Sequence, residues 1–169
     1  VFLLTLPGVE EIKKNKKMKL MKLACELGHF EIVRIFIEQG VEISEGCLWE
    51  AVTAGSLKIV KLLLEHGATA DDGGYLITPL MTAVMEGYVE IVHELLAKGA
   101  DVNKANVVGC TPLSRACYNN DPEIVLILLK HGARNLPERY ISERYDQDIE
   151  TMLEDYGIRR KSRWDCVLS

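Results

Sequence analysis

The stretch Ile59-Val60-Lys61-Leu62-Leu63-Leu64-Glu65-His66-Gly67 decides the fold, because versions of it occur four times in the 169-residue chain. Each version has an Ile-Val pair, a mostly apolar run and a final glycine. The glycines are spaced by 27, 32 and 33 residues and are Gly40, Gly67, Gly99 and Gly132. A nearly constant period of this size indicates one structural unit copied along the chain.

Two further sets of residues keep the same spacing. One set consists of alanines and the other of glycines with one asparagine, at Ala24, Ala51, Ala83, Ala116, Gly28, Gly55, Gly87 and Asn120. The apolar residues of each copy fall at helical spacing, which predicts two amphipathic helices per unit. The alanines lie in the first helix of each copy, where a small side chain allows a second helix to approach closely. Gly67, Gly99 and Gly132 follow the second helix, where glycine favours a left-handed helix end. The sequence therefore predicts four helical hairpins.

The third and fourth copies carry the most specific motif. Thr78-Pro79-Leu80 and Thr111-Pro112-Leu113 place Thr as an N-cap and Pro at the first helical position. In the fourth copy, Gly99-Ala100-Asp101-Val102-Asn103 and Gly109 precede this motif. With these residues the chain resembles the ankyrin-repeat family over residues 18–136. The resemblance implies an all-α solenoid of stacked helical hairpins with short β-hairpin fingers, which binds other proteins.

Two departures from the family pattern stand out. Met81 and Ser114 occupy the place of the usual His after Thr-Pro-Leu, which puts in question the hydrogen bonds that this His makes between repeats. The segment between Gly40 and Cys47 is also shorter than its counterpart in the fourth copy. We therefore expect a truncated finger between the first two repeats.

We divide the chain into four segments. Residues 1–17 form an N-terminal capping segment, 18–136 the four repeats, 137–158 a degenerate C-terminal capping repeat, and 159–169 a basic tail. The lysines of the first segment read as a solvated capping face rather than as a nuclear-targeting or phosphate-binding site. The chain does not begin with Met, which we interpret as a trimmed N-terminus.

Composition limits the class of protein. The net charge of −5 disfavours binding of the whole chain to nucleic acid or to an anionic membrane. No apolar run approaches the roughly 20 residues needed to span a bilayer. The five cysteines contain no Cys-x-x-Cys pair, which is typical of reduced thiols inside a cell. We expect a cytoplasmic monomer.

No catalytic or metal-binding pattern is convincing. Cys110, Cys117 and His131 match no zinc spacing, and no glycine-rich phosphate loop is present. The carboxylates of Asp71 and Asp72 read as loop solvation. The sequence thus predicts a protein that is not an enzyme and needs no cofactor.

The partner-binding surface is expected on the concave face that the fingers and first helices line in an ankyrin stack. By register, that face contains Trp49, Thr53, Tyr75, Ile77, Met85, Glu86, Val107, Val108, Cys110, Arg115, Tyr118 and Asn119. Aromatic and Arg side chains often dominate interface energies, which favours Trp49, Tyr75, Arg115 and Tyr118. The alternative for Trp49 is that it fills the space left by the missing finger.

Two modification sites are also expected. The ending Cys166-Val167-Leu168-Ser169 resembles a CaaX prenylation box, and a final Ser favours farnesyl. The basic residues Arg159, Arg160, Lys161 and Arg163 would strengthen membrane attachment. The alternatives are an ordinary exposed Cys166 or a chain that continues past Ser169. The resemblance to ankyrin repeats also makes Asn103 a candidate for hydroxylation.

Two functional hypotheses follow. The first is a protein–protein interaction adaptor, tethered to the cytoplasmic face of a membrane in a eukaryotic cell if Cys166 is prenylated. The alternative is a targeting or substrate-recognition module of a larger enzyme or ubiquitin-ligase subunit whose catalytic part lies outside this chain.

Overall fold

A computed structural model describes residues 9–72, 77–137 and 146–158, and in these ranges the chain forms helices and no strand. The helices are α1 (Val9–Glu26), α2 (Phe30–Glu38), α3 (Cys47–Thr53), α4 (Leu57–Glu65), α5 (Pro79–Met85), α6 (Val89–Ala97), α7 (Pro112–Asn119), α8 (Pro122–Lys130) and α9 (Gln147–Asp155). None of these helices combines the length and the hydropathy that crossing a bilayer requires.

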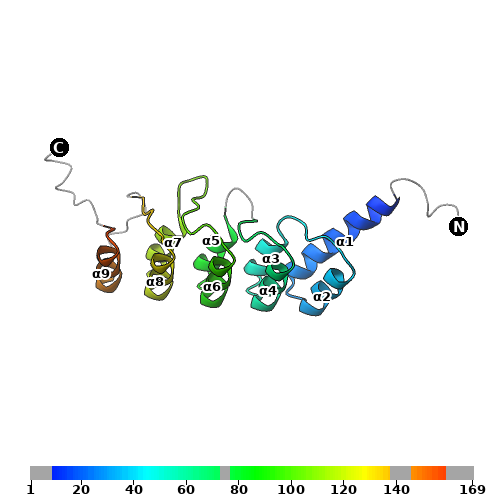
Figure 1. The fold of residues 1–169 in the computed structure, drawn as a ribbon, viewed down its shortest axis with the longest axis horizontal. Coiled ribbons are helices and arrows are strands. Elements are labelled where there is room, and N and C mark those ends of the chain that lie inside the picture. The colour runs from blue at the N-terminus through cyan, green and yellow to red at the C-terminus, as the bar shows by residue number, and fades with distance from the viewer. Residues whose placement is uncertain (1–8, 73–76, 138–145, 159–169) are drawn as a thin grey trace.

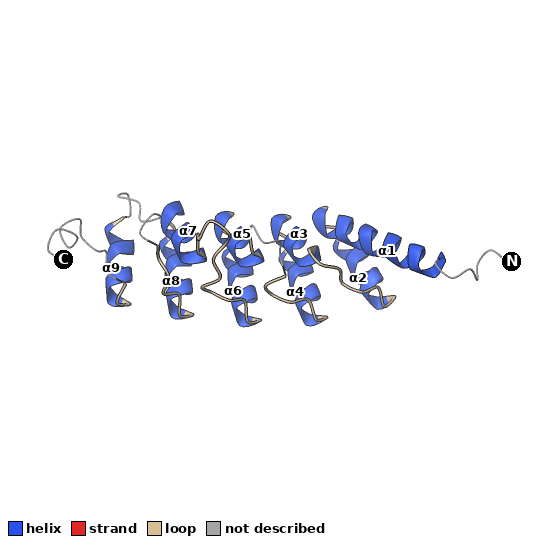
Figure 2. Cartoon of the chain, turned by 90° about the horizontal axis from the view of Figure 1, so that it is seen from above, coloured by secondary structure: helices blue, strands red, loops and turns tan. Residues whose placement is uncertain are grey.

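The helices stack as hairpins in two rows. The first helices α1, α3, α5 and α7 pack against one another in sequence, and α2, α4, α6 and α8 form the second row (Figure 1). A view from above shows the same order, with α9 following α8 at the C-terminal end (Figure 2). The predicted all-α solenoid of stacked helical hairpins is confirmed.

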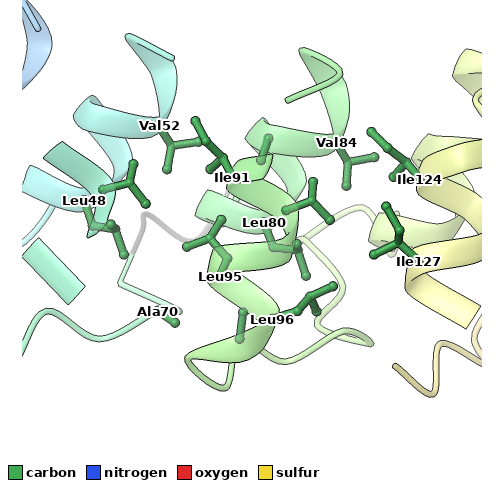
Figure 3. Close-up of a cluster of buried hydrophobic side chains, with 14 of the residues drawn as sticks. Leu48, Val52, Ala70, Leu80, Val84, Ile91, Leu95, Leu96, Ile124 and Ile127 are labelled. Carbon is green, nitrogen blue, oxygen red and sulfur yellow. The ribbon is translucent and has the colours of Figure 1, made fainter. Parts of the chain in front are cut away.

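The repeated apolar residues form one continuous core. In α4, Ile59, Val60 and Leu63 are fully buried, because the helical spacing places them on one face. The alanines of α3, α5 and α7 are also fully buried, where their small side chains allow the first helices to approach one another. Figure 3 shows part of this core, to which neighbouring repeats contribute Val52, Leu80, Ile91 and Ile124.

Gly67, Gly99 and Gly132 follow the second helices with positive φ, as the sequence predicted, and residues after the first helices adopt the same conformation. At Gly55, φ is +65°, and a Cβ there would lie 3.0 Å from the Tyr88 side chain, so a larger residue would be strained in its backbone and would have to displace Tyr88. Asn120 takes the same conformation with φ of +56°, and is the one non-glycine residue with positive φ in the described part of the chain.

The expected β-hairpin fingers have no strands in the described segments. In the connection 98–111, backbone bonds close a turn from Gly109 N–H to the Asn106 carbonyl and from Asn106 N–H to the Cys110 carbonyl. The Asn106 side chain accepts hydrogen bonds from the N–H groups of Val108 and Cys110, which a paired strand would otherwise use. The connection 39–46 is shorter than 98–111, as the sequence predicted.

The two ends of the stack differ from a simple repeat. α1 runs without interruption from Val9 to Glu26, so the expected boundary between residues 17 and 18 falls inside one helix. At the other end, Ile149 and Leu153 of α9 are buried. The assignment of residues 1–17 and 137–158 as capping segments remains a prediction.

Candidate partner-binding surface

The first helices and the connections that lead into them form a surface that we call the first-helix face. Most of the expected contact residues lie on it. Thr53, Glu86 and Asn119 are exposed there, and Ile77 and Met85 are half-buried. The connection 98–111 rises on the same side of the stack as the first helices (Figure 1). The expected Tyr75 lies outside the described residues.

Arg115 and Tyr118 form the strongest candidate contact pair on this face. Both belong to α7, and the Arg115 guanidinium carbon lies 5.5 Å from the centre of the Tyr118 ring. Tyr118 is 69% exposed. The Nε–H of Arg115 is buried and has no hydrogen-bond partner within the described structure. An unsatisfied buried donor costs about 1–3 kcal/mol, so this Nε–H is a polar group whose hydrogen bonding the described residues leave incomplete.

Val107 and Val108 form an apolar tip on the connection that leads into α7. Their side chains are 65% and 56% exposed. The Asn106 side chain holds the backbone of this tip through the hydrogen bonds described above. The tip is therefore an ordered apolar surface next in sequence to the helix that carries Arg115.

The structure gives Trp49 an internal role. Its side chain is half-buried, and its Nε1–H donates a hydrogen bond of 3.1 Å to the Thr82 hydroxyl on α5. Trp49 stands two residues before Ala51, the same place that Met81 and Ser114 take before their alanines. It thus links two repeats from the position where the family has His. That shared register was the signal in the sequence that could have revealed this role.

Cys110 is not a surface residue, contrary to our expectation. Its side chain is 4% exposed, and its Sγ lies 3.3 Å from the Ser114 hydroxyl. The turn at Asn106 directs this residue toward the start of α7 instead of toward solvent. We therefore remove Cys110 from the candidate surface.

Asn119 is exposed, but its side-chain amide is engaged. The Nδ2 group donates to the carbonyls of Val84 and Met85, at 3.1 and 3.2 Å. These bonds tie the end of α7 to the end of α5. Asn119 therefore supports the first-helix face as well as lining it.

Polar residues of the connections bridge neighbouring repeats, a role that the sequence interpretation missed. The Asp71 carboxylate accepts a hydrogen bond from Asp101 N–H at 3.2 Å, so Asp71 is not merely a solvated loop residue. Asn103 donates to the Gly132 carbonyl at 3.2 Å and accepts from Arg134 N–H at 2.9 Å. Hydroxylation of Asn103 remains a prediction, on a side chain whose amide group is already hydrogen-bonded.

The described thiols lie inside the stack. Cys25, Cys47, Cys110 and Cys117 are free and buried. Burial raises the pKa of Cys117 to about 12, and the hydrogen bond to Cys47 together with burial raises the pKa of Cys25. No cluster of three or more His, Cys, Asp or Glu side chains in the described residues could hold a metal ion. Cys166 and the basic residues 159–163 lie outside the described residues.

Comparison with known proteins agrees with this architecture. A family model described as "Ankyrin repeats (3 copies)" matches residues 1–73 and 69–138. Human ankyrin repeat and SOCS box protein 11 is 33% identical over 111 residues, covering 62% of this chain and 34% of that protein.

Two other relatives share the repeats in much longer proteins. Ankyrin repeat and KH domain-containing protein mask-1 of Caenorhabditis elegans is 30% identical over 148 residues, covering 67% of this chain and 6% of that protein. Mouse protein fem-1 homolog A-like is 33% identical over 92 residues, covering 51% of this chain and 14% of that protein. This chain thus spans about a third or less of the length of these relatives. The family match over most of its residues, together with the stacked hairpins, shows that the chain belongs to the ankyrin-repeat family.

Proposed function

We propose that this protein is a non-enzymatic adaptor that binds a partner protein on the first-helix face, the concave face of an ankyrin stack. The observation that carries the proposal is the pair of Arg115 and Tyr118, because the ring is exposed while the Arg115 Nε–H has no hydrogen-bond partner among the described residues. The apolar tip at Val107 and Val108 extends the same surface. We expect the adaptor to act as a monomer in the cytoplasm.

The chemistry of the pair indicates what the partner brings. A carboxylate on the partner would accept hydrogen bonds from the Arg115 guanidinium, and charge-assisted bonds of this kind are stronger than neutral ones. Apolar side chains beside that carboxylate would cover Tyr118 and the valine tip. Arg and Tyr anchors of this kind cost 2 kcal/mol or more when they are truncated to Ala.

The test is cross-linked affinity capture from an extract of the source cells with two double variants. Arg115→Ala/Tyr118→Ala removes the proposed anchors, and Glu123→Ala/Lys130→Ala changes exposed residues of α8 in the same repeat. Thermal unfolding establishes that both variants are folded. We expect a protein captured by the wild type and by the α8 variant to be lost, at least tenfold, with the α7 variant. Equal capture by all three would refute the assignment of the surface.

A second candidate function is favoured by the fact that the chain covers only part of the length of its relatives. The SOCS-box relatives are named for a module beside the repeats, and the chain spans 34% of such a protein. On this proposal the repeats are the targeting or substrate-recognition part of a larger enzyme or ubiquitin-ligase subunit. Sequencing the complete transcript tests it, because a reading frame that encodes the repeats and no further domain would exclude it.

Membrane tethering is a separate proposal that depends on Ser169 being the carboxyl terminus of the protein. A farnesyl group on Cys166 next to Arg159, Arg160, Lys161 and Arg163 would supply the two signals that stable attachment needs. Fractionation of cells that express the wild type, Cys166→Ser or Ser162→Ala tests this. We expect only Cys166→Ser to leave the membrane fraction, and equal distribution of all three would refute tethering.

A further inference from the structure

Among the described residues, the N-terminal end of the stack exposes six large apolar side chains, and four of them form what we call the end face. These four come from α1 and α2 and are 45–46% exposed: Leu20, Leu23, Ile32 and Ile35. Leu20 and Leu23 lie on one side of α1, one turn apart. The buried residues Met21, Ala24 and Cys25 lie on the side that faces α3.

Register shows that these positions normally form contacts between repeats. Ile32 corresponds to Ile59, Ile91 and Ile124, which are 0–2% exposed. Leu20 corresponds to Cys47, which is fully buried, and Ile35 corresponds to Ile127, which is 7% exposed. The counterparts of Ile32 and Leu20 are buried in every internal copy, whereas those of Ile35 are half-buried in the second and third copies and buried in the fourth. The first copy presents the same contact surface with no described hairpin on it.

The opposite end of the stack is finished differently. α9 turns Ile149 and Leu153 inward, while Asp148, Thr151 and Asp155 are exposed. A polar outer face of this kind is what a terminal repeat needs for solubility. The described outer side of α9 is therefore polar, whereas the end face has the apolar character of an internal junction.

Charge disfavours a second copy of the chain as the occupant of the end face. α1 contains six lysines and three glutamates, so two end faces packed together would bring like charges into proximity. Packing the end face on α9 of another copy would set apolar side chains against Asp148, Thr151 and Asp155. A hairpin with an apolar ridge and flanking carboxylates suits the end face better than either arrangement.

We propose that in the whole protein an additional helical hairpin of the repeat type, N-terminal to α1 in the same polypeptide, packs on the end face. It would contact Ile32 and Ile35 as α1 and α2 contact α3 and α4. α1 projects past α2 at this end, so its exposed side extends the surface available to the added hairpin (Figures 1 and 2). Human ankyrin repeat and SOCS box protein 11 is about twice as long as this chain, because its 111 aligned residues are 34% of its length, and mask-1 is longer still; both lengths are consistent with a longer stack.

Thiol labelling tests the proposal in the complete natural polypeptide and in the 169-residue chain. Ile32→Cys is placed in a Cys166→Ser background of each protein, and Val108→Cys, on the valine tip, is the matched control of similar exposure. We expect the labelling rate at position 32 to be at least tenfold lower in the complete polypeptide, with equal rates at position 108. Equal rates at position 32 would overturn the proposal, as would a natural polypeptide with no hairpin upstream of α1.

Light scattering tests whether a second copy of the chain, rather than an upstream hairpin, occupies the end face. We expect the 169-residue chain to be monomeric both as wild type and as Ile32→Glu, because the substituted side chain is exposed in the isolated chain. A wild-type dimer that Ile32→Glu dissociates would overturn the proposal in favour of a second copy. Neither measurement involves Arg115 or Tyr118, so this proposal and the proposed function can fail independently.

Discussion

At the scale of single residues, the thiol of Cys117 links burial to pH. Its side chain is 1% exposed, and burial raises its pKa from the ordinary 9.0 to about 12 because a thiolate is poorly solvated inside α7. The folded protein therefore holds this proton more tightly than the unfolded chain does. The stabilisation is complete below pH 9 and is lost as the pH rises toward 12.

We predict that Cys117→Ala will weaken the alkaline loss of stability. The free energy of unfolding of the wild type should fall by up to about 1.4 kcal/mol more per pH unit than that of the variant above pH 9. Urea unfolding at pH 8, 9 and 10 measures both slopes, and comparing slopes removes the constant cost of the smaller side chain. Parallel slopes would show that this thiol does not titrate differently in the folded state.

Individual roles were harder to predict from the sequence than the fold was. The register correctly placed Tyr118 at an exposed position of α7, which helical periodicity explains, and it placed the two valines in the exposed connection before α7. The register could have indicated an internal place for Trp49, but it does not identify Thr82 as the hydrogen-bond partner, and it does not reveal that Cys110 points inward. Those outcomes depend on side-chain direction and on a turn held by Asn106, which spacing does not encode.

At the scale of helices, the two Thr-Pro-Leu motifs begin α5 and α7 in different ways. Thr78 accepts a hydrogen bond from Met81 N–H, which is an ordinary N-cap. The Thr111 hydroxyl accepts from Ser114 N–H and also donates a bond of 2.6 Å to the Asn135 carbonyl, while the Ser114 hydroxyl accepts a bond from Thr111 N–H. Ser114 thus completes a capping box in the place of the family's His.

We predict that Thr111→Ala will destabilise the protein more than Thr78→Ala. Loss of a cap alone costs about 1 kcal/mol, and the second hydrogen bond adds about 1 kcal/mol for Thr111. Chemical unfolding of the two variants and the wild type gives the comparison, in which each serves as the control for the other. Equal destabilisation would mean that the bond to Asn135 contributes nothing.

The helices themselves were largely predictable, with exceptions at sites where local chemistry competes with the repeat. Asn120 replaces a glycine in left-handed conformation, and its side chain bonds to Asp146 before α9. The continuous α1 was missed because its lysine-rich first turns lack a regular apolar spacing. The strand-free fingers were missed because side chains rather than a second strand satisfy the backbone of the described connection 98–111.

At the scale of the whole molecule, the junctions between repeats differ in their polar links. Asp71, Asn103 and Thr111 join the connections and repeats of the C-terminal half. The first junction has the short connection 39–46 and the ion pairs of Lys14 with Glu42 and Lys22 with Glu50. Ion pairs near the surface contribute about 0–1 kcal/mol. The first hairpin should therefore be held least firmly.

We predict that the 169-residue chain opens from its N-terminal end. Amides of α1 and α2 should exchange with deuterium faster than those of α5 to α8 in the native state, because each hairpin is stabilised mainly by its neighbours. Hydrogen exchange resolved by mass spectrometry measures this order. Asn103→Ala should raise exchange in α8 while leaving α1 and α2 unchanged. Uniform exchange along the chain would contradict the prediction.

The bridges made by Asp71 and Asn103 also bear on how the protein responds to mechanical force. Each one joins only adjacent units, so tension applied at the two ends passes through every junction in series and is not shared among them. A stack held this way lengthens in steps, one hairpin at a time, beginning at its weakest junction. A partner that bound two neighbouring units at once would share the tension across their junction through its own contacts. Its binding would therefore resist extension of the stack.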